Sequence, residues 1–243
     1  MIKRPPPEAL YRAHANTEGP LDPSSVTGGY RYDDFRVPAQ FHVLYTGDSV
    51  EGCFIEKLQR YRGSDAEAYN ILNAIKHSDG DTAVIPTPNQ IPAAVLRNLA
   101  ASVLRVMDVT RQVVQIDDLK SIMTLRDIGK EMGIDLPDLK PGDVLRTEYT
   151  VSQRLSVIIY EAHLAPGSAS RSSLDSPSAS LVHTNFNLYR DTPESGSEIY
   201  VPVERVETHR ALDRYRTELA AAIAHLGAAP ALPLDHPDMS TQT

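Results

Sequence analysis

Short runs in which apolar and polar residues alternate recur along the chain. Runs of this kind that are rich in β-branched and aromatic residues are typical of strands with one buried face. The pattern predicts strands over residues 9–14, 29–33, 41–46, 103–107, 112–116, 181–189 and 198–207. We therefore expect a sheet of short, mainly antiparallel strands.

Helical spacing of apolar residues begins after Ser49. The stripe Val50, Phe54 and Leu58 predicts an amphipathic helix that is capped by a polar residue at 48 or 49 and ends near residue 61. Further helices are predicted over residues 65–77, 118–132, 149–164 and 209–226. Together with the strands, these helices predict an α+β fold.

Prolines and small polar residues mark the segments without periodicity. Three consecutive prolines predict an unstructured lead over residues 1–8, because proline opposes both helix and sheet pairing. Serine, glycine and proline predict a flexible loop over residues 165–180. Residues 228–243 are predicted to form a disordered tail. We expect one domain over residues 9–227, within which residues 63–118 could be an insertion.

Composition narrows the function classes. Of 243 residues, 41% are hydrophobic, enough for a sizeable core, and the formal net charge is −8. A net negative charge argues against nonspecific nucleic-acid binding, which needs a basic face. Cys53 is the single cysteine, so no intramolecular disulfide forms. No apolar run approaches the ~20 residues of a membrane span, and no secretory signal is visible, so we expect a cytoplasmic protein.

Four residues of candidate chemistry follow one another within the first quarter of the chain: Arg12, Arg31, Tyr45 and Glu56. Arginine supplies paired donors for phosphate. Glutamate can accept a hydrogen bond from a ribose hydroxyl or act as a general base. In combination they indicate a site for a dinucleotide that is cleaved.

Each of these residues also has a plainer interpretation. Arg12 suits a structural ion pair, Arg31 suits the end of a turn, and Tyr45 suits core packing. Glu56 lies off the apolar stripe of its helix, as a solvated charge would. Gly52, one turn earlier, would let a ligand approach the helix closely.

Several motifs together resemble the RES domain family. They are Tyr11-Arg12, Gly28-Gly29-Tyr30-Arg31-Tyr32, Val43-Leu44-Tyr45-Thr46-Gly47-Asp48-Ser49, Cys53-Phe54-Ile55-Glu56, Tyr160-Glu161-Ala162-His163 and Arg171-Ser172-Ser173-Leu174-Asp175. RES domains are typically toxins of bacterial toxin–antitoxin pairs. They resemble ADP-ribosyltransferases in fold and are similar to enzymes that consume NAD. The resemblance therefore implies an ADP-ribosyltransferase-like core.

The resemblance also implies roles for the candidate residues. Arg12 and Arg31 would bind the pyrophosphate or position the ribose of NAD. Tyr45 would stack on the nicotinamide. Glu56 would contact the nicotinamide ribose as positive charge develops on it.

The family serine would be Ser172, with Ser173 as a neighbouring candidate and Ser170 as a third. A tryptophan that usually follows the family arginine is replaced here by Tyr32, and the chain has no tryptophan. The serine block lies in a longer serine-rich run, so its alignment can shift by a residue or two.

These implications lead to one expected activity and two alternatives. We expect an NAD glycohydrolase or NAD phosphorylase that takes NAD as substrate and needs no other cofactor and no metal. The alternatives are a mono-ADP-ribosyltransferase that modifies a protein and an inactive RES-like binding module. The family implies a DNA-binding antitoxin of the Xre type as partner. From the net charge and the lack of a long apolar run we expect no direct nucleic-acid or membrane contact, and a homo-oligomer is left open.

Overall fold

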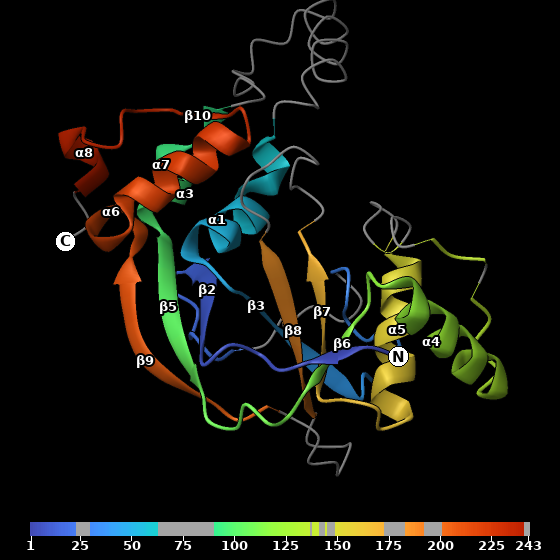
Figure 1. Ribbon diagram of the computed structural model, residues 1–243. Helices are drawn as coiled ribbons and strands as arrows, with labels where there is room; N and C mark the ends of the chain where they lie inside the picture. Colours follow the sequence, from blue (N-terminus) through green and yellow to red (C-terminus); the bar gives the residue numbers. More distant parts are fainter. Residues whose placement is uncertain are drawn as a thin grey trace, which may run out of the picture.

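One mainly antiparallel sheet organises the molecule (Figure 1). The computed structural model describes residues 1–22, 30–62, 90–136, 138–140, 144, 149–172, 183–191 and 201–240. The strand order is β1-β6-β7-β8-β3-β2-β5-β9, and of these neighbouring pairs only β6 and β7 run parallel. The strands are β1 (Lys3–Arg4), β2 (Ala9–Ala15), β3 (Phe41–Gly47), β5 (Leu99–Val106), β6 (Val113–Gln115), β7 (Gly167–Arg171), β8 (Thr184–Asp191) and β9 (Val203–Arg210). The predicted α+β class is confirmed.

Helices pack against the sheet in two groups. The helices are α1 (Val50–Leu58), which continues into the 3₁₀ turn η1 (Gln59–Tyr61), α3 (Ala93–Arg97), α4 (Leu119–Glu131), α5 (Thr150–Glu161), α6 (Ala211–Arg214), α7 (Arg216–His225) and α8 (Pro237–Ser240). Figure 1 shows α1, α3, α6, α7 and α8 gathered at one end of the molecule and α4 with α5 at the other. Each group covers its own apolar cluster.

The middle of the sheet joins these two halves. Strands β3 and β8 pair along their whole length, from Phe41 opposite Asp191 to Gly47 opposite Asn185. Strands β2 and β3 share a single pair, Tyr11 with Gly47, so they diverge beyond that point. Helix α1 follows β3 directly and lies over this junction.

Two segments within the domain differ in type from the prediction, and the helix predicted over residues 209–226 begins only at Ala211 and divides into α6 and α7. Residues 30–33 form turns, where a strand was predicted, because Asp33 ties the backbone N–H of Tyr30 into a turn. The predicted loop over residues 165–180 begins with β7, whose Gly-Ser-Ala-Ser segment is buried. Glycine is needed at position 167 because a Cβ there would lie only 2.4 Å from the carbonyl oxygen of Asn187 on the neighbouring strand β8.

Both ends of the chain are more ordered than predicted. In the lead, Lys3 and Arg4 form β1, which pairs antiparallel with β6. In the tail, β10 (Ala229–Pro230) pairs in parallel with β4 (Gln90–Ile91). Met239 in α8 is 1% exposed and belongs to the apolar cluster under α1 and α7. Burial of apolar side chains thus orders a segment whose prolines suggest disorder.

The range proposed as an insertion divides into two parts. Residues 63–89 lie outside the described residues, and so does the helix predicted over residues 65–77. Strand β5, within the same range, pairs with β2 over seven positions and with β9 on its other side. This later part is therefore integral to the main sheet.

Candidate active site

Glu56 lies on α1 and faces the ends of two strands. Ser49 caps this helix and accepts a hydrogen bond from the Gly52 backbone N–H. The Glu56 Oε1 atom accepts a hydrogen bond from Ser172 Oγ at 2.5 Å and another from Asn185 Nδ2 at 2.8 Å. The carboxylate is therefore held by two donors. The structure brings the predicted Glu56 and Ser172 together.

Gly52 does not leave space for a ligand, contrary to its sequence interpretation. A Cβ at this position would lie 2.9 Å from the Cβ of His183. The imidazole Nδ1 of His183 lies 2.8 Å from Ser49 Oγ. The backbone carbonyl of His183 accepts a hydrogen bond from the Ser172 backbone N–H. Glycine is needed here because His183 packs against the first turn of α1 and joins it to the end of β7.

Tyr45 on β3 is anchored through its hydroxyl. The hydroxyl donates to Asp33 Oδ1 at 2.8 Å and accepts the Tyr32 backbone N–H at 3.1 Å. Burial, followed by the nearby Asp33 charge, raises the pKa of Tyr45 well above its ordinary value. The hydroxyl thus stays protonated and fixes the loop before β3. The ring of Tyr30, which is 52% exposed, contacts the Tyr45 ring edge-on at a centroid distance of 5.9 Å.

Arg31 extends from the same loop toward the beginning of α5. Its Nη1 donates to the Val144 carbonyl at 3.1 Å, and its guanidinium lies over the Tyr149 ring at 5.1 Å. The Arg31 carbonyl accepts from Ser152 Oγ, which fixes the backbone on α5. The side chain is therefore oriented by an aromatic face and one carbonyl.

Tyr32 connects the arginine with the glutamate. Its buried hydroxyl lies 3.0 Å from Ser170 Oγ. Burial raises the pKa of this hydroxyl; the charge of Glu56 also raises it, and the charge of Arg31 lowers it. Both charges act on one hydroxyl, so Arg31 and Glu56 each lie close enough to Tyr32 to influence it. Tyr32 takes the place of the expected tryptophan and was not itself predicted as a site residue.

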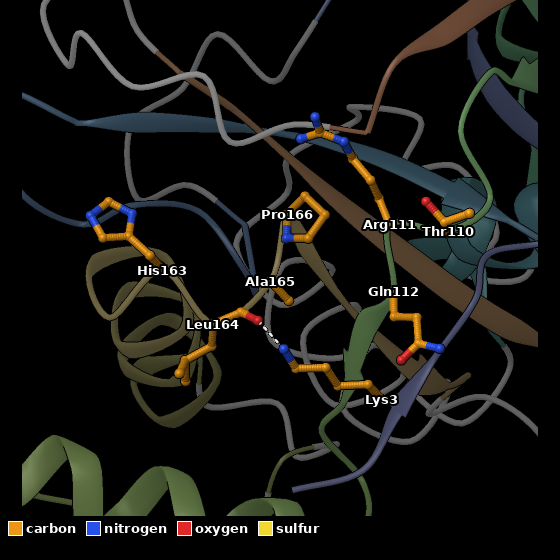
Figure 2. A pocket seen from close by; sticks show the side chains of 8 residues that line it. All are labelled: Lys3, Thr110, Arg111, Gln112, His163, Leu164, Ala165 and Pro166. Atoms are coloured by element: carbon orange, nitrogen blue, oxygen red, sulfur yellow. Dashed lines mark hydrogen bonds between the residues drawn. The ribbon is translucent and has the colours of Figure 1, made fainter.

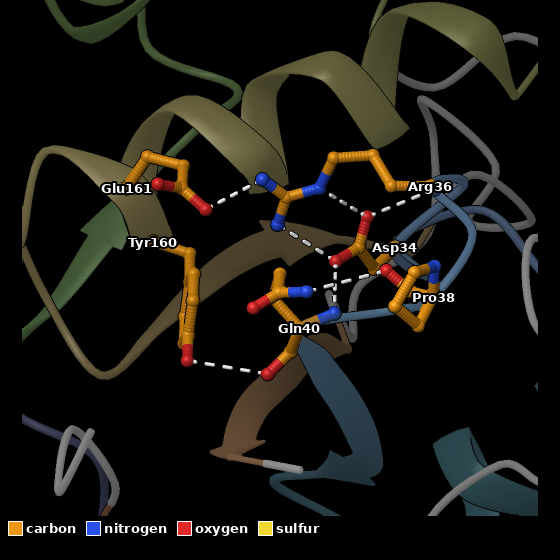
Figure 3. Close-up of polar contacts among 6 residues, drawn as sticks. All are labelled: Asp34, Arg36, Pro38, Gln40, Tyr160 and Glu161. Atoms are coloured by element: carbon orange, nitrogen blue, oxygen red, sulfur yellow. Dashed lines mark hydrogen bonds and ion pairs between the residues drawn. The ribbon is translucent and has the colours of Figure 1, made fainter. Parts of the chain in front are cut away.

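An ion-pair cluster holds the loop that carries these residues (Figure 3). The fully buried Asp34 carboxylate accepts hydrogen bonds from Arg36 Nε and Nη2 and from the backbone N–H groups of Arg36 and Gln40. Arg36 Nη1 contacts Glu161 at the end of α5 at 2.5 Å. Tyr160 Oη donates to the Gln40 carbonyl. These contacts fix the loop against the helix.

Arg12 lies on the other face of the sheet. Its neighbours Tyr11 and Ala13 pack against the cluster under α1, whereas Leu10 belongs to a cluster that also contains Leu44 and Phe186. Since side chains alternate along a strand, Arg12 shares the face of Leu10. Tyr45 and Asn185 are sequence neighbours of Leu44 and Phe186 and point the opposite way. The structure therefore does not bring Arg12 to Glu56.

The surroundings of Arg12 are those of a half-buried structural cation. Its Nη1 is buried and has no hydrogen-bond partner within the described part of the chain. Burial lowers the pKa of Arg12, while the charges of Glu18 and Asp22 raise it and that of Arg190 lowers it. Cys53 on α1 also raises it, and Glu56 is not among the charges that act on Arg12.

Two of the three candidate serines, Ser170 and Ser172, lie within the described residues. Ser172 contacts Glu56, and Ser170, one pleat earlier on the same face, contacts Tyr32. Ser173 lies outside the described residues. The contact with the carboxylate supports Ser172 as the family serine. Asn185 was missed, because an asparagine in a strand carries no motif and only the register of β8 brings it to Glu56.

Two open depressions on the described part of the chain are lined by other residues than those of this cluster. One, of about 530 Å³, is bordered by Lys3, Gln112 and the turn over residues 163–166, where Lys3 Nζ donates to the Leu164 carbonyl (Figure 2). The other, of about 570 Å³, includes Arg171 and Thr184. Neither has Glu56, Arg31 or Tyr45 among its lining residues. The candidate site is defined by the polar contacts, and in the described ranges no group of three or more His, Cys, Asp or Glu side chains could hold a metal ion.

No helix among the described elements is long and apolar enough to cross a membrane.

Comparison with known proteins gives one match. No curated protein and no solved structure matches the chain. The family model of the RES domain matches residues 9–211 of the 243. This span contains the loop, the helix and the strands that form the candidate site, and the chain belongs to the RES domain family.

Proposed function

We propose that this protein cleaves the bond between nicotinamide and ribose in NAD. The observation that carries the proposal is the Glu56 carboxylate, which Ser172 and Asn185 hold at the sheet face that Tyr45 also occupies. Membership in the RES family, with its toxin-like, NAD-related domains, supports the choice of substrate.

The chemistry requires a carboxylate near the sugar. When the C–N bond breaks, its electron pair leaves with the nicotinamide nitrogen, which becomes neutral and needs no general acid. Positive charge develops on the ribose, and a fixed carboxylate stabilises it. Water or phosphate then forms the new bond to the sugar carbon and loses its proton. Glu56 is suited to this role because its donors already fix its orientation.

Recognition of the rest of NAD falls to the loop before β3. The Arg31 guanidinium, held over Tyr149, can pair with the diphosphate. The exposed Tyr30 ring and its neighbour Tyr45 offer aromatic surface for the flat nicotinamide. Arg12 has no part in this arrangement, because it lies on the other face of the sheet. A toxin of this kind would be neutralised by an antitoxin, which we propose as its partner in the cell.

The decisive experiment compares NAD consumption by the wild-type protein with that by Glu56→Gln. Glutamine keeps the size and the acceptor oxygen that Ser172 and Asn185 bind but lacks the charge that stabilises the sugar. We expect a loss of about 100-fold or more in kcat, with an unchanged melting temperature. Glu51→Gln, on the first turn of the same helix, is the matched control and should consume NAD at the wild-type rate.

Labelled NAD identifies the acceptor in the same assay. Free ADP-ribose, or its 1-phosphate when phosphate is present, would support cleavage to a small acceptor. Label on protein would instead support ADP-ribosyl transfer. Wild-type turnover by a folded Glu56→Gln variant would contradict the role of Glu56, and a wild-type protein that leaves NAD intact would contradict the proposed function.

A further inference from the structure

We propose that Asn185 is a positioning residue that, together with Ser172, fixes one oxygen of Glu56 and leaves the other directed at the sugar. The inference rests on the function proposed above and adds a residue to its site. It follows from three features: the position of Asn185 in the sheet, the atom that it binds, and the approach of helix α1.

The position of Asn185 is fixed from both sides. It is the second residue of β8, where it lies opposite Gly47 of β3 and opposite Ser170 of β7. Strand β3 leads into the helix that carries Glu56, and β7 leads into Ser172. Asn185 therefore stands on the strand between the two segments that meet at the carboxylate.

Both hydrogen bonds to Glu56 end on the same atom. Ser172 Oγ and Asn185 Nδ2 both donate to Oε1, and Oε2 has no partner among the described residues. A glutamate side chain has three rotatable bonds, and two donors of charge-assisted hydrogen bonds restrict them together. A carboxylate held in this way needs no reorientation as charge develops on the sugar. Oε2 is the oxygen that remains to face the substrate.

The close approach of α1 makes this contact possible. A Cβ at Gly47 would lie 2.9 Å from Cys53 Sγ, so a side chain at the end of β3 would push the helix away. Cys53 Sγ also donates to the Tyr11 carbonyl on β2. The helix is thus seated directly on the strand ends, and Glu56, one turn after Cys53, comes within reach of Asn185.

The test replaces two asparagines on one strand. Asn185→Leu removes the donor to Glu56 and keeps the side chain branched at Cγ. Asn187→Leu is the matched control: Asn187 lies on the same face of β8 one pleat further on, and its Nδ2 donates to Ser168. Loss of one charge-assisted hydrogen bond predicts about 10- to 100-fold lower kcat for Asn185→Leu. We expect KM for NAD to stay unchanged, and Asn187→Leu to keep the wild-type kcat.

A second variant covers the case in which Asn185→Leu does not fold. Asn185→Asp keeps the shape but sets a carboxylate against Glu56, and repulsion should lower kcat at least as far. The side-chain amide signal of Asn185 in a ¹⁵N NMR spectrum gives a readout without turnover. This signal should shift in Glu56→Gln and stay in place in Glu51→Gln.

The outcomes separate this inference from the function on which it rests. Wild-type turnover that survives in a folded Asn185→Leu or Asn185→Asp variant would overturn the positioning role and leave the proposed function standing. A parallel rise in KM would also overturn it, because it would show that Asn185 binds NAD. A wild-type protein without turnover would overturn both.

Discussion

At the scale of single residues, the hydroxyl of Tyr45 ties together the loop that carries Arg31. It satisfies one carboxylate oxygen of Asp33 and the backbone N–H of Tyr32. Tyr45→Phe would leave both groups buried with one partner fewer. We expect the free energy of unfolding to fall by about 1–3 kcal/mol, as measured by urea denaturation, although the aromatic ring is kept.

Tyr11→Phe is the control for this prediction. The Tyr11 ring packs half-buried on the cluster under α1, and its hydroxyl has no hydrogen bond to any described residue. Its replacement should leave stability close to that of the wild type. Equal losses in the two variants would indicate that the ring environment, and not the anchored hydroxyl, determines the cost.

Single residues also show how far the sequence can predict a site. The helical stripe predicts that Glu56 lies off the apolar face of its helix, and the order of the motifs predicts that Glu56 and Ser172 belong to one site. In the structure the two side chains are hydrogen-bonded although 116 positions separate them in the sequence. Asn185 lies beyond such reasoning, since only the pairing of β8 with β3 and β7 brings it to the carboxylate. For Arg12, the sequence shows that its side chain and those of Tyr11 and Ala13 lie on opposite faces of the strand. It does not show which of these faces packs against α1, because that depends on tertiary packing.

At the scale of elements, the Asp34 cluster clamps the loop before β3 onto α5. The side chain of Asp34 has no exposed surface and accepts four hydrogen bonds, while Arg36 is also bound to Glu161. Asp34→Asn would leave the Arg36 cation in a half-buried place without its main partner. We expect a loss of about 2–3 kcal/mol in the free energy of unfolding, measured by chemical denaturation.

Asp138→Asn provides a matched ion pair at the surface. The Asp138 side chain is 97% exposed and contacts Arg126, so solvent screens the pair and its removal should have little effect. Because the clamped loop carries Arg31 and Tyr32, Asp34→Asn should also raise KM for NAD. A clamp variant as stable as the surface variant would refute the structural role of Asp34.

Elements differ in how clearly the sequence marks them. The helix that begins after Ser49 combines an apolar stripe with a side-chain cap, and both signals are local. Strand β7 has neither signal: its Gly-Ser-Ala-Ser sequence is typical of a loop, and it becomes a strand because β6 and β8 pair with it on either side. Elements stabilised mainly by their neighbours are the ones that local patterns miss.

At the scale of the whole molecule, the first and the last described segments each form a strand that pairs with a distant part of the chain. Strand β1 adds to the edge of the sheet beside β6, and β10 pairs with β4. Proline content predicts disorder at both ends, because it weighs only the local backbone. At the N-terminal end, pairing of β1 with β6 overrides this local signal. At the C-terminal end, the apolar residues between the prolines override it, since they pack on the cluster under α1 and α7.

The C-terminal segment should therefore contribute to stability through Met239. This side chain is 1% exposed in the cluster under α1 and α7, and Arg97 Nη1 donates to the neighbouring Asp238 carbonyl. Met239→Ala would leave a cavity, and we expect it to lower the free energy of unfolding by about 2–4 kcal/mol. Met123→Ala, at a position that is 50% exposed on α4, should change it far less. The measurement is the midpoint of thermal or urea unfolding of the two variants. Equal midpoints would mean that the C-terminal segment does not pack on the domain. A lower midpoint for Met239→Ala alone would establish the segment as part of the core.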